Sequence, residues 1–92
     1  MPQIFKVGEY RIYFWTNESN PLEPIHVHVI AGRPQANATK IWITQTGRTI
    51  LCNNASRIPP YELRRLMKII EANSDIIIER WLSCFNTISY YC

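Results

Sequence analysis

Two histidines, His26 and His28, are separated by one residue in the segment 24–29, and the sequence contains no other histidine. On a β-strand, residues two apart point to the same face of the sheet. The two imidazoles would therefore share a face, with their Cα atoms roughly 6 to 7 Å apart. Imidazoles placed in this way can bind a metal ion, act as a general acid and a general base, or hydrogen-bond a phosphate.

A metal site would need more ligands than these two histidines. Zinc takes three protein ligands in catalytic sites and four in structural sites. Glu18, Glu23 or Cys52 would have to complete the set, and nothing in their spacing selects one of them. The sequence therefore predicts no metal site and no cofactor.

Cleavage of RNA is the enzymatic alternative. One imidazole would take the proton of the 2′-hydroxyl, the other would protonate the leaving oxygen, and a cation would stabilise the transition state. His26 and His28 would then be the catalytic residues of a metal-independent ribonuclease, with Arg33, Lys40 or Arg57 as the cation.

A structural interpretation competes with catalysis. In it the two histidines pack against Trp15 or Trp42 across the sheet and hydrogen-bond neighbouring groups. We give this interpretation more weight, so the sequence favours a binding protein over an enzyme.

A second polar cluster lies in the segment 53–59, between a predicted strand and a predicted helix. Ser56 and Arg57 would stand beside the amino end of that helix, where backbone N–H groups favour anions. Alternatively, Ser56 and Asn54 serve only as turn and capping residues and Arg57 is solvated. Further on, Arg64, Arg65 and Lys68 form a one-sided basic stretch, which is ordinarily a solvated helix face.

The first half of the chain alternates apolar and polar residues, which predicts half-buried strands. The segments with this pattern are 10–15, 25–29 and 40–44, and a turn at Gly47 leads into a fourth strand at 48–52. A short strand at 4–7 would make five.

The second half changes to a helical period. Pro59 and Pro60 suit the start of a helix, and we expect Asn73 to end it in a left-handed conformation and Ser74 to cap a second helix. The tail 86–92 could dock or form an edge strand. The predicted fold is α+β, a four- or five-stranded, mainly antiparallel sheet followed by a C-terminal helical hairpin packed on one face. Residues 1–92 would form a single domain.

Composition and sequence pattern limit the partners and the cellular compartment that we expect for this protein. Ten Lys and Arg residues against seven Asp and Glu give a net charge of +3, which permits contact with phosphates without requiring it. The sequence shows no signal-peptide pattern, no apolar run long enough for a membrane span and no close cysteine spacing. We therefore expect a reduced, cytoplasmic protein without a membrane partner.

Several segments together resemble the small bacterial family called domain of unknown function 4160. They are 1–5, 10–18, 23–29, 38–43, 54–59 and 71–81, and the His-x-His strand and the last helix with Trp81 are the most specific. Many members have two prolines before the first histidine, where this chain has Pro24 and Ile25. The resemblance implies a protein of bacteria or their mobile elements, often accompanied by a small protein of domain of unknown function 2442 in a toxin–antitoxin-like arrangement. It implies no catalytic residue, so only His26 and His28 are carried over, as a signature of unknown purpose.

These observations predict a small binding or interaction module of toxin–antitoxin type that engages a protein partner or a phosphate-bearing ligand. The predicted ligand-binding residues are Trp15, His26, His28, Arg33, Lys40, Trp42, Ser56 and Arg57. The alternatives are the ribonuclease and an oligomer that sequesters a nucleotide by stacking its base on aromatic rings and holding its phosphates with arginines. Exposed sheet edges also favour a homo-oligomer.

Overall fold

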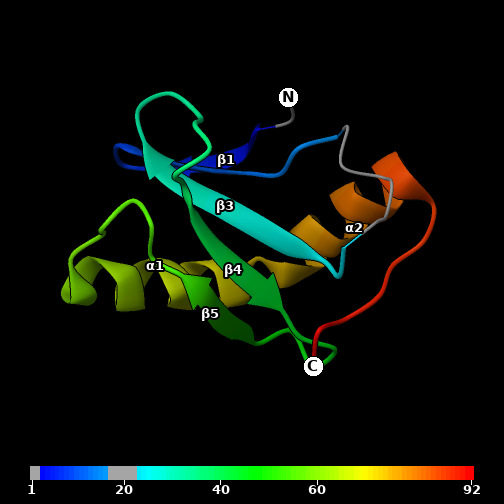
Figure 1. The fold of residues 1–92 in the computed structure, drawn as a ribbon. Coiled ribbons are helices and arrows are strands. Elements are labelled where there is room, and N and C mark those ends of the chain that lie inside the picture. Colours follow the sequence, from blue (N-terminus) through cyan, green and yellow to red (C-terminus); the bar gives the residue numbers. More distant parts are fainter. Residues whose placement is uncertain (1–2, 17–22) are drawn as a thin grey trace.

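The computed structural model describes residues 3–16 and 23–92 and shows the expected α+β architecture (Figure 1). Five antiparallel strands follow one another in the spatial order β1-β2-β3-β4-β5, and two helices come after them. The strands are β1 (Gln3–Val7), β2 (Tyr10–Tyr13), β3 (His26–Ala31), β4 (Thr39–Ile43) and β5 (Thr49–Asn53). The helices are α1 (Pro60–Ala72) and α2 (Ser74–Phe85). The short strand that the sequence allowed at residues 4–7 is therefore present as β1.

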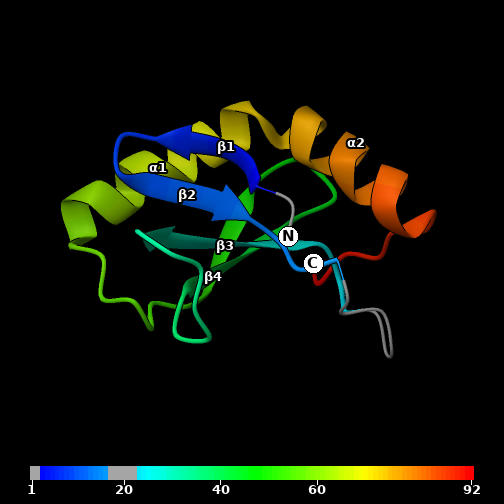
Figure 2. The same ribbon diagram turned by 90° about the horizontal axis from the view of Figure 1, so that it is seen from above.

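Both helices cover the same face of the sheet (Figure 2). The alternation of the strands explains this, because every second side chain of β2, β3 and β4 is apolar and enters one core with the apolar stripe of the helices. Fully buried members of this core are Ile12, Phe14, Ile25, Val27, Val29, Ile41, Ile43, Leu66, Ile70 and Ile77. Burial of an aliphatic side chain of this size stabilises a fold by about 1.5–3 kcal/mol.

The junction between the helices differs from its prediction. α1 begins after Pro59 with Pro60 in its first turn and ends at Asn73, as expected. However, Asn73 has φ −114° rather than a left-handed conformation, and it is also the N-cap of α2. Ser74 is the first helical residue instead of the cap. Asn73 is the whole link, and the two helices run end to end along the sheet and do not fold back as a hairpin (Figures 1 and 2).

The opposite face of the sheet carries a second, smaller cluster. Tyr13, Ile30 and Ala38 are buried there, and Trp15 packs against them. Strand register places Tyr13 opposite His28 on β3, Lys40 of β4 on the other side of His28, and Trp42 opposite His26. The sheet therefore has apolar side chains on both faces, and this second face positions the histidines.

The tail after α2 docks and forms no strand. The N–H of Ile25 donates to the carbonyl of Ser89 at 2.9 Å, and the N–H of Gln45 donates to the carbonyl of Cys92 at 3.2 Å. Figure 1 shows the tail descending from α2 to the turn between β4 and β5. Ile88 and Tyr90 pack against the main core on the way.

Candidate functional site

His26 is a fully buried residue of the second face. Its ring centroid lies 5.0 Å from that of His28, 5.7 Å from that of Trp42 and 5.4 Å from that of Trp81 on α2. Its Nδ1 lies 3.0 Å from the carbonyl oxygen of Pro24. Since a carbonyl can only accept, Nδ1 carries the proton in this hydrogen bond.

His28 is half-buried and packs on Tyr13, with ring centroids 5.4 Å apart. Burial lowers the pKa of His28 to about 4, and the positive charges of His26, when protonated, and Lys40 add to this effect. The ring is therefore neutral at neutral pH. Within residues 3–16 and 23–92, no group hydrogen-bonds its buried Nε2 atom.

This geometry bears on the ribonuclease hypothesis. The two imidazoles touch edge to face, with an interplanar angle of 83°, so a phosphate cannot lie between them. A general acid and a general base must also reach their protons at hydrogen-bond distance, and the fully buried His26 offers no such approach. The contact of His26 with Trp42 is the kind of packing that the structural interpretation expects.

Lys40 is tied to its surroundings on this face. Its Nζ lies 2.5 Å from a carboxylate oxygen of Glu23 and 4.5 Å from the ring centroid of Trp42. The hydrogen bond from Lys40 lowers the pKa of Glu23. Glu23 also lies close to the histidines, yet the described part of the chain contains no group of three or more His, Cys, Asp or Glu residues that could hold a metal ion.

Aromatic rings continue on both sides of the histidines. Tyr13 contacts Trp15 at a centroid distance of 5.4 Å, and Trp42 stacks on Tyr91 of the tail at 5.0 Å with an interplanar angle of 5°. Together with the two histidines, these rings form a continuous series of six side chains, which we call the aromatic row. Its members are Trp15, Tyr13, His28, His26, Trp42 and Tyr91. The site prediction omitted Tyr13 and Tyr91, although the alternation of β2 placed Tyr13 on the face of Trp15.

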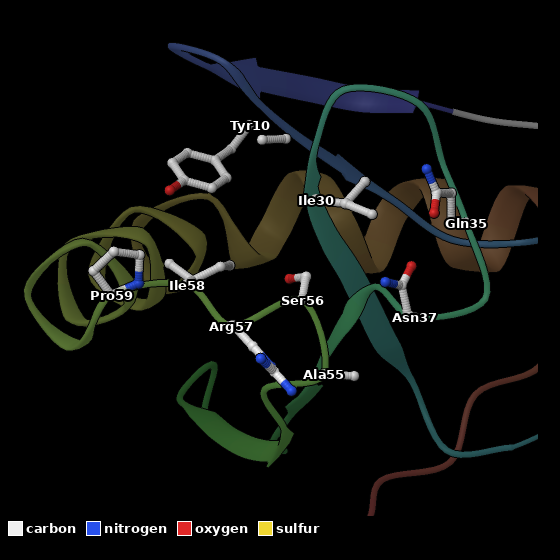
Figure 3. A pocket seen from close by; sticks show the side chains of 10 residues that line it. Tyr10, Ile30, Gln35, Asn37, Ala55, Ser56, Arg57, Ile58 and Pro59 are labelled. Atoms are coloured by element: carbon white, nitrogen blue, oxygen red, sulfur yellow. The ribbon is translucent and has the colours of Figure 1, made fainter.

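A pocket of about 490 Å³ lies at the end of the sheet where β3 finishes and α1 begins. Figure 3 shows Gln35 and Asn37 on the loop after β3 on one side, and Ser56 and Arg57 on the other. Tyr10 closes it near Ile58 and Pro59. Of the predicted ligand-binding residues, only Ser56 and Arg57 line this pocket.

The segment that presents Arg57 is held in place by Asn54. The side chain of Asn54 accepts a hydrogen bond from the N–H of Ile58 at 3.0 Å and donates one to its carbonyl at 2.9 Å. The N–H of Arg57 donates to the backbone carbonyl of Asn54 at 3.0 Å. Arg57 itself has φ +58°, a left-handed conformation that is unusual for a residue with a side chain.

The side chains of Ser56 and Tyr10 are also held by hydrogen bonds to residues that do not line the pocket. The Oγ of Ser56 lies 2.6 Å from the Oγ1 of Thr39 and 3.3 Å from the carbonyl oxygen of Val29. The hydroxyl of Tyr10 donates to the carboxylate of Glu62 on α1, and this hydrogen bond, together with burial, raises the pKa of Tyr10 to about 12. Two walls of the pocket are thus attached to β4 and to α1.

The structure places seven of the eight predicted site residues at two separate sites. Arg33 belongs to neither place and lies exposed on the loop after β3. The aromatic row and its neighbour Lys40 hold Trp15, His26, His28, Lys40 and Trp42, and the pocket holds Ser56 and Arg57. The pocket residues Tyr10, Gln35 and Asn37 were missed, because nothing in their spacing shows that the loop at 32–38 faces the loop at 54–58.

A five-stranded antiparallel meander covered on one face by two helices, with two adjacent histidine rings on the other, defines a small α+β domain. The model of the family described as Domain of unknown function (DUF4160) matches residues 9–82, and the chain belongs to this family. The resemblance predicted from the sequence is confirmed. No curated protein and no solved structure gives a significant match. Within the described residues, neither helix combines the length and hydropathy that a membrane span requires.

Proposed function

We propose that the protein is a small binding module whose pocket, lined by Ser56 and Arg57, takes a small phosphate-bearing ligand. The observation that carries this proposal is the left-handed Arg57, clamped by Asn54 at the rim of a polar pocket. Toxin–antitoxin-type pairing with a second small protein, which the family resemblance implies, remains a prediction beside it.

The chemistry of the pocket suits an anion. Its side chains offer the guanidinium of Arg57, the hydroxyl of Ser56 and the amides of Gln35 and Asn37, and no carboxylate from the described residues lines it. A guanidinium can form two parallel hydrogen bonds with a phosphate. A volume of about 490 Å³ also falls within the usual range of small-molecule pockets, about 300–1,000 Å³.

Backbone strain supports a binding role for Arg57. A residue with a side chain pays about 1 kcal/mol or more to adopt the left-handed region, and such residues concentrate at ligand sites. Here the hydrogen bonds of Asn54 to Ile58, within the protein itself, hold this conformation. A segment ordered in advance loses less conformational entropy on binding, which strengthens affinity.

The histidine pair then supports the fold of the sheet and has no chemical role in this proposal. His26 fills the space between Trp42 and Trp81, and His28 fills the space beside Tyr13. Binding without cleavage also agrees with the sequestering alternative, in which the ligand is a nucleotide. Nucleoside monophosphates test this case.

The test is the thermal stability of the wild type, Arg57→Gly and Arg33→Ala with inorganic phosphate, nucleoside monophosphates and small carboxylates. Glycine adopts φ > 0 without strain, so Arg57→Gly is expected to melt close to the wild type without ligand. A phosphate-bearing compound should raise the melting temperature of the wild type and of Arg33→Ala, but not of Arg57→Gly.

Three results would contradict the proposal. They are stabilisation that survives Arg57→Gly, stabilisation only by carboxylates, and no stabilisation by any compound. Chromatography of the bound compound after incubation tests catalysis. We expect it to be recovered intact, whereas a phosphodiesterase would release cleaved product.

A further inference from the structure

The outward face of α1 carries one aromatic ring and three cations. Tyr61, Arg64, Arg65 and Lys68 occupy positions i, i+3, i+4 and i+7, so they lie on one side of the helix and line a hollow of about 280 Å³. We call these four residues the basic stripe. None of them lines the pocket of Ser56 and Arg57.

The cations of the basic stripe form no ion pair within the described residues. α1 contains two carboxylates, and both serve the sheet. Glu62 accepts a hydrogen bond from the hydroxyl of Tyr10, while Glu71 accepts from the backbone N–H of Thr49 at 3.0 Å and from its hydroxyl at 2.9 Å. Ion pairs found among residues 3–16 and 23–92 include no partner for Arg64, Arg65 or Lys68.

Like charges repel one another within the basic stripe. Arg64 and Lys68 are four residues apart and Arg65 and Lys68 are three apart, and like charges at these spacings repel each other across one turn. The repulsion would be relieved by an anionic partner that contacts all three cations.

We propose that the basic stripe binds single-stranded nucleic acid, with the three cations on successive phosphates and Tyr61 stacked on a base. Tyr61 is 73% exposed, more than any other large apolar side chain among the described residues. Single-stranded nucleic acid binders combine a cationic track for the backbone with aromatic rings for the bases. An acidic peptide would use the cations but would give no reason for an exposed ring among them.

The experiment is fluorescence anisotropy with a labelled oligouridylate of about twelve nucleotides, a length that covers a typical single-strand site. Lys68→Glu is compared with Arg80→Glu, which makes the same charge change on the exposed face of α2. Tyr61→Ala is compared with Tyr91→Ala, since Tyr91 is also well exposed, at 61%, but is stacked on Trp42. Circular dichroism melts of each variant check folding.

Lys68→Glu is expected to weaken binding by about tenfold or more and to reduce the salt dependence of binding by about one phosphate contact. Tyr61→Ala should weaken binding by about fivefold or more through lost stacking. The two control variants should bind like the wild type, and so should Arg57→Gly, which separates this site from the ligand pocket.

The proposal is overturned if the wild type does not bind the oligouridylate at low salt. It is also overturned if Lys68→Glu and Arg80→Glu weaken binding equally, because binding would then follow net charge alone. A third contrary result is tighter binding of an acidic peptide, such as oligoglutamate, that Tyr61→Ala does not change. That outcome would assign the basic stripe to a protein partner.

Discussion

His28 links protonation to the stability of the second sheet face. Burial lowers its pKa from the ordinary 6.5 to about 4, so between these values the unfolded chain binds a proton that the folded chain does not. The stabilisation from the neutral ring is therefore complete above pH 6.5 and is lost as the pH falls toward 4. Because the ring is only half-buried and water screens part of its charge, we expect a loss of about 1–2 kcal/mol across this window.

Urea unfolding at a series of pH values measures this loss. His28→Gln keeps a polar side chain of similar reach but cannot be protonated, so its free energy of unfolding should change less between pH 6.5 and 4 than that of the wild type. Glu23 contributes to the pH dependence of stability at lower pH than His28, because the hydrogen bond from Lys40 lowers the pKa of this carboxyl group from 4.5. Equal pH dependence in wild type and variant would show that His28 is not the group responsible.

Among the elements, the two edge strands differ in how they are protected. β1 carries the exposed Lys6, which discourages pairing with another strand. The register is irregular at both edges of the sheet, between Gln3 and Phe5 of β1 and between Lys40 and Ile41 of β4, so this feature does not distinguish them. β5 contains no charged residue and no proline, and its Leu51 is 39% exposed. Antiparallel pairing of two β5 strands would place no like charges opposite each other. We therefore expect the predicted homo-oligomer to form through β5.

A pair of leucines with the same exposure tests this expectation. Leu51 on β5 and Leu82 on α2 are each 39% exposed, so Leu51→Lys and Leu82→Lys add the same charge to surfaces of similar accessibility. Light scattering after gel filtration should show a dimer for the wild type and Leu82→Lys and a monomer for Leu51→Lys. A monomeric wild type at high concentration would refute the pairing.

The elements were predictable where one local rule decides them. Alternation around Ile12, Val27 and Ile41 was sufficient for the three central strands, because every second side chain enters one core. Asn73 ends α1 as predicted, but its left-handed conformation and the cap at Ser74 were mispredicted, because Asn73 both ends the first helix and caps the second. The direction of the second helix was not predictable either, since a short link allows both a hairpin and an end-to-end arrangement.

The site was predictable only in part. Period two correctly placed His26 and His28 on the face opposite Val27, but their burial depends on rings from other elements, including Trp81 and Tyr91. The pocket joins loops that are far apart in sequence, and the left-handed conformation of Arg57 comes from hydrogen bonds of Asn54 rather than from its own residue type. Neither feature leaves a local pattern in the sequence.

In the molecule as a whole, both faces of the sheet are packed against other side chains. The helices cover one face and build the main core, and the aromatic row stabilises the other. The tail connects the two. Ile88 and Tyr90 pack on the core, while Tyr91 stacks on Trp42 in the aromatic row. A segment without helix or strand therefore contributes to both layers.

The stack of Tyr91 on Trp42 predicts that Tyr91 stabilises the fold even though its side chain is well exposed. Tyr91 and Tyr61 are both well exposed, at 61% and 73%, but only Tyr91 stacks on another ring among the described residues. Stacked aromatic pairs add about 0.5–1.5 kcal/mol beyond the area they bury, whereas ordinary surface substitutions change stability by about 0.5 kcal/mol or less. We expect Tyr91→Ala to lower the free energy of unfolding by about 1 kcal/mol and Tyr61→Ala to leave it nearly unchanged.

Urea unfolding followed by both tryptophan fluorescence and circular dichroism provides the measurement. If the tail belongs to the same cooperative unit as the sheet, the two signals of Tyr91→Ala will shift together to lower urea. If the tail instead detaches on its own, fluorescence from Trp42 will change before the secondary structure is lost, and the midpoint by circular dichroism will match the wild type. Equal effects of the two tyrosine variants would mean that the stack on Trp42 does not stabilise the fold.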